Sequence, residues 1–152
     1  MASFNHSNTS LQICVDTIET RASSTGDGGF GGRIFGRRLK MPLEFFNMTD
    51  FLLKIEALMD AQKFPRAFQR ARSFRPKDEM SVFAAETPED GMSAQEVSSA
   101  SGSRATFSIL VISRRDSTWQ GRIDKLDGNK AEEFSSVLEL IHMIDELLAA
   151  IG

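Results

Sequence analysis

Cysteine and histidine are scarce in this sequence, and their scarcity excludes several kinds of site. Cys14 is the only cysteine among 152 residues, so the chain can form no internal disulfide and no cysteine-based zinc cluster. There are two histidines, His6 and His142, and the G-x-S-x-G nucleophile motif is absent. We therefore predict no cofactor, no metal and no catalytic residue, and we expect that the protein is not an enzyme. Chemistry carried by carboxylates alone stays open.

Long apolar runs are also missing. No stretch reaches the ~18 consecutive apolar residues of a membrane-spanning helix, and residues 1–15 lack the basic start and apolar run of a secretory signal. Apolar residues make up 41% of the chain and charged residues 26%, as in an ordinary soluble domain. The net charge of −3 argues against general coating of nucleic acid but leaves room for a local basic patch. We expect a cytoplasmic protein with no membrane partner.

A glycine-rich stretch at 24–38, STGDGGFGGRIFGRR, contains the G-x-G-x-x-G spacing of a phosphate-binding loop. In a dinucleotide fold such a loop opens a helix, whereas residues 32–42 show no helical apolar pattern. The Lys-Ser/Thr pair of a P-loop and the other signature segments of a kinase are absent. The stretch is therefore interpreted as a hairpin connection and not as a nucleotide site.

Two segments carry the apolar periodicity of helices. Residues 47–62 form the first, with Asn47 as N-cap and Asp50 in the first turn. Residues 135–152 form the second, where Ser136 and Glu139 have the spacing of a capping box. The expected apolar stripes are Phe51, Leu52, Ile55, Leu58 and Met59 in the first helix, and Val137, Ile141, Ile144, Leu148 and Ile151 in the second.

Strands are predicted before each helix from β-branched and alternating residues. In the first half we expect a strand within 11–20 and two short strands within 33–46. In the second half we expect strands within 104–116, 118–126 and 130–134, with Asp127-Gly128 as a hairpin turn.

The two halves resemble each other in sequence. Residues 32–61 align without gaps on 121–150, an offset of 89 residues from Gly32 to Gly121. The eight identities in thirty positions include a Gly-Arg-Ile block and a Glu-Phe pair, and the two cap positions coincide. Phe30 falls on Trp119 just before the aligned block. This pattern is typical of a duplicated structural unit, although chance similarity of two amphipathic helices is the alternative.

The segment between the halves changes sharply in charge. Residues 63–77 (KFPRAFQRARSFRPK) carry six Lys/Arg and no acid, and residues 78–103 carry six Asp/Glu and no base. The acidic part is rich in Ser, Ala and Glu and has no sustained period, so we predict a disordered linker over 76–103. The remaining divisions are a flexible N-terminus at 1–10, a first strand/helix unit with the basic segment at 11–75, and a second unit at 104–152.

The predicted fold is α+β. An antiparallel sheet is built from two similar βββα-type units, both helices pack on one face, and a pseudo-twofold axis relates the units. A single unit of this size buries too little apolar surface to be stable alone, so the two units together are expected to form one domain.

Arginine and aromatic residues mark the candidate partner-binding surface. Phenylalanines are interleaved with the charges of the basic segment, and Trp119 lies near further arginines. This pattern suits an acidic protein partner or RNA. Trp119 is either a core anchor or an exposed stacking platform, and the basic segment can equally be a solvated connector. The candidates are Arg66, Arg70, Arg72, Arg75, Arg114, Arg115, Trp119 and Arg122.

Several motifs resemble a group of small uncharacterised bacterial proteins of clostridial type. The matching segments are Phe64-Pro65 with Ala67, Arg72-Ser73-Phe74, Ser117-Thr118-Trp119-Gln120-Gly121 and Phe134-x-Ser136-x-Leu138-Glu139-Leu140. The chain departs from the pattern at Arg66, Arg115-Asp116 and Ser135. The resemblance covers roughly 32–75 and 104–150. It implies a bacterial, cytoplasmic protein and no catalytic residues.

These observations lead to a functional hypothesis. We expect a non-enzymatic binding or regulatory protein that acts through protein–protein interaction. The alternative is binding of RNA or single-stranded nucleic acid through the Arg/Phe-rich segment and Trp119.

Overall fold

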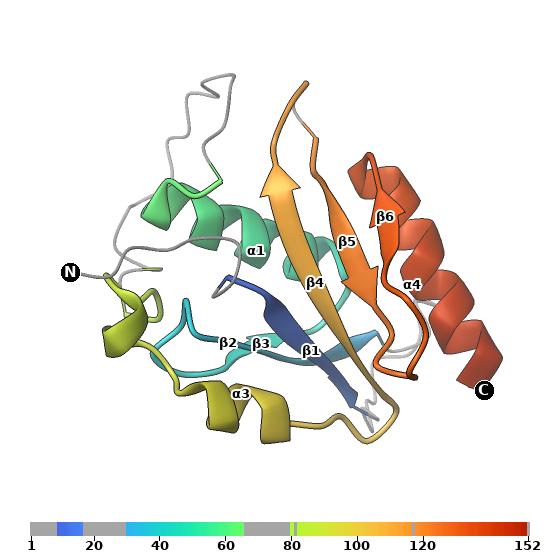
Figure 1. Ribbon diagram of the computed structural model, residues 1–152, viewed down its shortest axis with the longest axis horizontal. Coiled ribbons are helices and arrows are strands. Elements are labelled where there is room, and N and C mark those ends of the chain that lie inside the picture. The colour runs from blue at the N-terminus through green and yellow to red at the C-terminus, as the bar shows by residue number, and fades with distance from the viewer. Residues whose placement is uncertain (1–8, 17–29, 66–79, 81, 117, 152) are drawn as a thin grey trace.

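The protein forms one six-stranded antiparallel sheet with helices on it (Figure 1). The computed structural model describes residues 9–16, 30–65, 80, 82–116 and 118–151. The strands are β1 (Leu11–Asp16), β2 (Gly31–Gly36), β3 (Leu43–Phe45), β4 (Ala105–Ser113), β5 (Gln120–Asp124) and β6 (Glu132–Phe134). The helices are α1 (Met48–Gln62), α3 (Ala94–Ser99), α4 (Val137–Ile151) and the short 3₁₀ helix η2 (Pro88–Asp90). Within this part of the chain, no helix is long and apolar enough to cross a membrane.

The internal repeat is confirmed element by element. The strand order β3-β2-β1-β4-β5-β6 is symmetric about its centre, with the strands of the first half on one side and those of the second half on the other. Each half contributes three strands and one long helix. The offset of 89 maps β3 onto β6 and α1 onto α4 with the same first and last residues. The predicted α+β fold with two βββα-type units is therefore correct.

The pseudo-twofold axis passes through the centre of the sheet. Ile13 pairs with Ile34 in the first half, and Ile109 pairs with Ile123 in the second, so β1 maps onto β4 with an offset of 96. The same offset maps Gln12 onto Ser108, and these two residues pair directly across the β1–β4 ladder. The halves are thus joined by a strand pair that is centred on the axis.

Cross-strand pairs explain why the shared sequence block is Gly-Arg-Ile with Glu-Phe. Gly32 lies opposite Phe45, and Gly121 lies opposite Phe134. A Cβ on either glycine would stand 1.9 Å from a backbone oxygen of the next strand, so no larger residue fits. The neighbouring arginine of each block lies opposite a glutamate. The identities are therefore those that the sheet itself requires.

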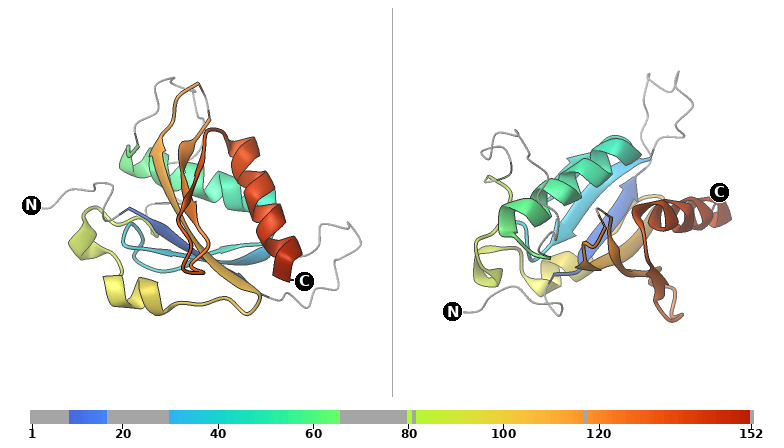
Figure 2. Two further views of the ribbon diagram at one scale, coloured as in Figure 1. Left: turned by 45° about the vertical axis from the view of Figure 1, so that its right-hand side comes forward. Right: turned by 90° about the horizontal axis from the view of Figure 1, so that it is seen from above.

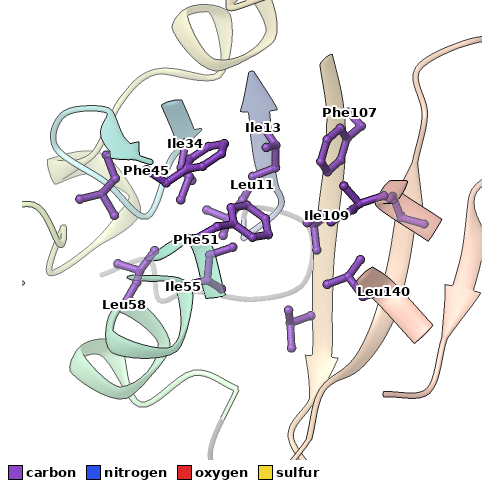
Figure 3. Close-up of a cluster of buried hydrophobic side chains, with 14 of the residues drawn as sticks. Leu11, Ile13, Ile34, Phe45, Phe51, Ile55, Leu58, Phe107, Ile109 and Leu140 are labelled. Carbon is purple, nitrogen blue, oxygen red and sulfur yellow. The ribbon is translucent and has the colours of Figure 1, made fainter. Parts of the chain in front are cut away.

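Both long helices cover the same face of the sheet, as predicted (Figures 1 and 2). Figure 3 shows Phe51 and Ile55 of α1 and Leu140 of α4 converging on Ile13 and the other strand side chains. The caps form as expected, because Asp50 N donates to Asn47 Oδ1 at 2.7 Å and Glu139 N donates to Ser136 Oγ at 3.1 Å.

The buried stripe of α4 differs from the predicted one. The buried side chains are Leu140, Ile144 and Leu147, whereas Val137 and Ile141 are only half-buried. Leucine and isoleucine occur on several sides of this helix, so periodicity alone did not fix which side faces the sheet. At the offset of 89 these three residues match Phe51, Ile55 and Leu58 of α1, while Leu148, the equivalent of buried Met59, is half-buried.

The prediction of a disordered linker is wrong for residues 82–103. This part of the chain contains η2 and α3, and it buries Met92 to 5% exposure. Met92 N donates to Leu39 O at 2.8 Å, and Gln12 Nε2 donates to Ala100 O at 2.6 Å from the sheet face opposite α1. Helix α3 has no buried residue of its own. Hydrogen bonds to distant residues hold α3 in place, so the helix forms without an apolar period in its sequence.

Candidate binding cleft between the long helices

An open cleft lies between the first turns of α1 and the middle of α4. Its volume is about 670 Å³. Two apolar side chains in it are exposed although they are large: Phe46 at 65% and Leu53 at 45%. The cleft is lined by Phe30, Phe46, Asn47, Met48, Thr49, Asp50, Leu53, Lys54, Ile141 and Asp145.

The helix cap holds Phe46 at the surface. Phe46 N donates to Asp50 Oδ2 at 3.0 Å, while Asn47 caps the helix start. The hydrophobic residue just before a helix cap often packs on the fourth residue after the cap, and here these residues are Phe46 and Phe51. Phe51 is instead fully buried against Phe30 and Phe45, with ring centroids 5.3 and 5.0 Å away. Phe46 is left outside this aromatic cluster.

Among the residues that the structure describes, one carboxylate of the cleft has no partner. Lys54 Nζ forms an ion pair with Asp50 Oδ2 at 3.2 Å and lies 5.4 Å from the centroid of the Phe46 ring. It also donates to Glu44 O. Asp145 of α4 is exposed, and the described residues offer it no hydrogen bond and no ion pair. The open part of the cleft is therefore apolar with a net negative charge.

Trp119 is a core residue and not a stacking platform. It is only 4% exposed, and its Nε1 donates to Glu56 Oε2 of α1 at 2.5 Å. The indole thus links the start of β5, in the second half of the chain, to α1, in the first half. A ring covered in this way has no face on which a base can stack.

Arg114 is also buried, at 4% exposure, and does not belong to a surface patch. Its guanidinium donates to Asp60 Oδ1 at 2.7 Å, to Glu56 Oε1 at 3.3 Å and to Pro65 O at 2.7 Å. The C-terminal end of α1 contains no basic residue in its last turn. Arg114 supplies a positive charge there, and this charge interacts favourably with the negative end of the helix dipole.

A second buried arginine, Arg38, was not predicted as a candidate. It is 1% exposed, donates to Gln62 Oε1 at 2.6 Å and to Phe64 O, and lies over the Phe64 ring. Burial, and next the charge of Arg114, lower the pKa of Arg38 to about 9. The guanidinium thus stays charged at neutral pH. Its role is structural, because it anchors the chain that leaves α1.

The two other candidates that the structure describes, Arg115 and Arg122, do not form one patch with the buried Trp119 and Arg114. Arg115 is exposed, and its backbone N–H donates to Gln120 Oε1. Arg122 is 55% exposed on the opposite sheet face and lies 3.8 Å from Glu133 Oε1. Arg66, Arg70, Arg72 and Arg75 lie outside the described residues.

Neither a cluster of metal ligands nor a reactive thiol occurs among the described residues. No three His, Cys, Asp or Glu side chains among them come close enough to hold a metal ion. Burial raises the pKa of the Cys14 thiol to about 11. The thiol is therefore protonated at neutral pH and is a poor nucleophile.

Comparisons with known proteins do not assign a family. The chain matches no protein-family model, no curated protein and no solved structure. The resemblance to small clostridial proteins stays a prediction, and function has to be argued from the cleft itself.

Proposed function

We propose that this protein is a non-enzymatic binding protein that receives side chains of a partner protein in the cleft between α1 and α4. The observation that carries the proposal is the exposure of Phe46 and Leu53 side by side with Asp145 in one cleft. Large apolar side chains that lie exposed together on a protein surface are typical of protein-interaction sites.

A protein partner fits this cleft better than a small molecule. Sites for small molecules enclose most of the surface of their ligand. Here Phe46, Leu53 and Ile141 stand along an open cleft between two helices, where a peptide segment can lie across them. Apolar side chains of such a segment would cover Phe46 and Leu53 and remove their surface from water.

Two of the residues predicted to bind nucleic acid, under the alternative hypothesis, are not exposed to a ligand. Trp119 and Arg114 are buried and engaged with Glu56. Arg115 and Arg122 are exposed but lie outside the cleft. An RNA interaction would therefore depend on the arginines of the basic segment and would be independent of Leu53.

The test compares two matched surface substitutions in the full chain. Random peptides displayed on phage are selected on the wild-type protein and then measured by fluorescence anisotropy against Leu53→Asp and Leu138→Asp. Leu138 is a suitable control because it is 63% exposed on α4 but does not line the cleft. We expect Leu53→Asp to abolish binding and Leu138→Asp to leave it unchanged. Selected peptides that bind both variants equally would overturn the proposal, as would the absence of any selected peptide.

A further inference from the structure

The pseudo-twofold axis gives the cleft an internal counterpart that is already filled. The offset of 89 maps Asp145 of α4 onto Glu56 of α1, and Trp119 onto Phe30. The carboxylates at 56 and 145 thus occupy equivalent places on the two long helices. The two aromatic residues are likewise equivalent, and both are buried, at 6% for Phe30 and 4% for Trp119.

Two donors satisfy the carboxylate of Glu56. Trp119 Nε1 donates to Oε2 at 2.5 Å, and Arg114 NH1 donates to Oε1 at 3.3 Å. Both donors come from the hairpin that joins β4 to β5. One junction between the halves is therefore closed by an arginine together with an aromatic N–H.

The equivalent junction at Asp145 lacks these donors. Phe30 stands where Trp119 would be, and a phenyl ring has no N–H to give. No described residue supplies a guanidinium to Asp145. Among the described residues, the carboxylate at 56 thus has an arginine partner and the equivalent carboxylate at 145 has none.

We propose that the cleft receives an arginine side chain of the partner protein, which pairs with Asp145 while a neighbouring apolar side chain lies on Phe46 and Leu53. This inference rests on the proposed function and specifies the partner chemically. Arginine suits the place because its planar guanidinium can form two parallel hydrogen bonds to one carboxylate and can stack on an aromatic ring.

The other charges in the cleft agree with a cationic occupant. Lys54 is the only base among the lining residues, and Asp50 and Glu44 O already engage its ammonium group. The carboxylates of Asp50 and Asp145 outnumber it, so an acidic side chain of a partner would meet net repulsion.

The experiment exchanges the charge at Asp145 in the full chain. Random peptides on phage are selected separately on the wild-type protein, on Asp145→Lys and on the control Glu146→Lys. Glu146 is exposed on the same helix but does not line the cleft. We expect peptides from the wild type and from Glu146→Lys to share an arginine, and peptides from Asp145→Lys to carry Asp or Glu in its place. Circular dichroism verifies that each variant is folded.

Affinities of the selected peptides separate this inference from the proposed function. We expect Asp145→Asn to weaken an arginine-containing peptide about tenfold, the effect of losing a charge-assisted hydrogen bond. The same peptide with leucine in place of arginine should bind both proteins equally. If peptides depend on Leu53 but contain no shared arginine, and Asp145→Asn has no effect, the arginine site is refuted while the binding cleft stands. If no peptide depends on Leu53, both proposals fail.

Discussion

The two halves of this molecule have the same frame and differ at their junctions. Strands, caps and most buried helix residues coincide at fixed offsets, so the cores of the two halves differ little. The junction around Glu56 is closed by Trp119 and Arg114, whereas the junction around Asp145 is an open cleft on Phe30. Residues that build the sheet are therefore shared between the halves, and residues around the two helix carboxylates are not.

The strongest test of the shared frame is substitution of the paired glycines. In Gly32→Ala and Gly121→Ala the new Cβ would stand 1.9 Å from Cys14 O and Leu110 O respectively. Backbone of a neighbouring strand must move to make room, so we expect each variant to lose more than ~3 kcal/mol of stability. Urea unfolding followed by circular dichroism measures the loss. Gly128→Ala is the control, since nothing lies within 4 Å of its Cβ position, and only its φ of 87° opposes the change.

Equal effects at Gly32 and Gly121 are the outcome expected of equivalent strands. A large loss at one glycine and none at the other would show that the halves differ in their sheets as well as in their junctions.

The second test concerns the helix core. Ile55 and Ile144 are both fully buried, so Ile→Ala at either position should cost about 2–5 kcal/mol. Leu58 is fully buried and Leu147 is 8% exposed, so Leu→Ala should cost somewhat more at 58. Chemical unfolding of the four single variants gives these values.

His142→Ala is the control for the helix core, because His142 is exposed. It should change the free energy of unfolding by less than ~0.5 kcal/mol. If the variants of one helix lost no more than this control, the two helices would not be equivalent parts of one core.

The sequence was sufficient for what depends on local pattern. Strand and helix positions, both caps and the repeat itself follow from periodicity, β-branched runs and turn residues within short windows. The fate of Trp119 and Arg114 did not follow, because their partner Glu56 lies on the helix of the other half, and only the β1–β4 pairing brings it close.

Long-range hydrogen bonding accounts for the other errors. Residues 82–103 lack an apolar period, yet bonds to Leu39 and Gln12 order them. The cleft could not be predicted from the sequence for a different reason. Phe46 looks like an ordinary core residue in the sequence, but its backbone bond to Asp50 at the start of α1 holds it outside the aromatic cluster, at 65% exposure.

A third prediction makes the two junctions alike. Trp119→Phe places a phenyl ring beside Glu56, as Phe30 does in the equivalent place near Asp145. It also removes the hydrogen bond to Glu56 Oε2. Glu56 retains Arg114, so we expect a loss of about 1–2 kcal/mol. Thermal and urea unfolding measure the change. In the Glu56→Gln background the same substitution should cost clearly less, because the charged acceptor is already gone. An identical cost in both backgrounds would mean that the ring's packing, and not its N–H, closes the junction.

The smallest expected effect concerns an ion pair that only the first half has. Asp16 accepts hydrogen bonds from Arg33 Nε at 2.9 Å and NH2 at 3.1 Å, and from Ser103 N at 3.1 Å. The equivalent residue in the second half, at the offset of 96, is Ile112. The hydrogen bond from Arg33 is the largest cause that lowers the pKa of Asp16 below its usual value.

A lowered pKa in the folded state fixes the sign of the pH dependence. The stabilisation by Asp16 is complete above the unfolded-state pKa of about 4 and is lost as the pH falls through the lower folded-state value. The pair is partly exposed to solvent, so we expect Asp16→Asn to lose about 1 kcal/mol or less at pH 7. Urea unfolding at pH 7 and at several values below pH 4 should show the wild type and the variant converging. The exposed pair in the other half provides the control, since Arg122 and Glu133 are 55% and 80% exposed. Glu133→Gln should leave stability unchanged at every pH. A gap between wild type and Asp16→Asn that persists at the lowest pH would show that the carboxylate's charge does not hold the two strands and residues 101–103 together.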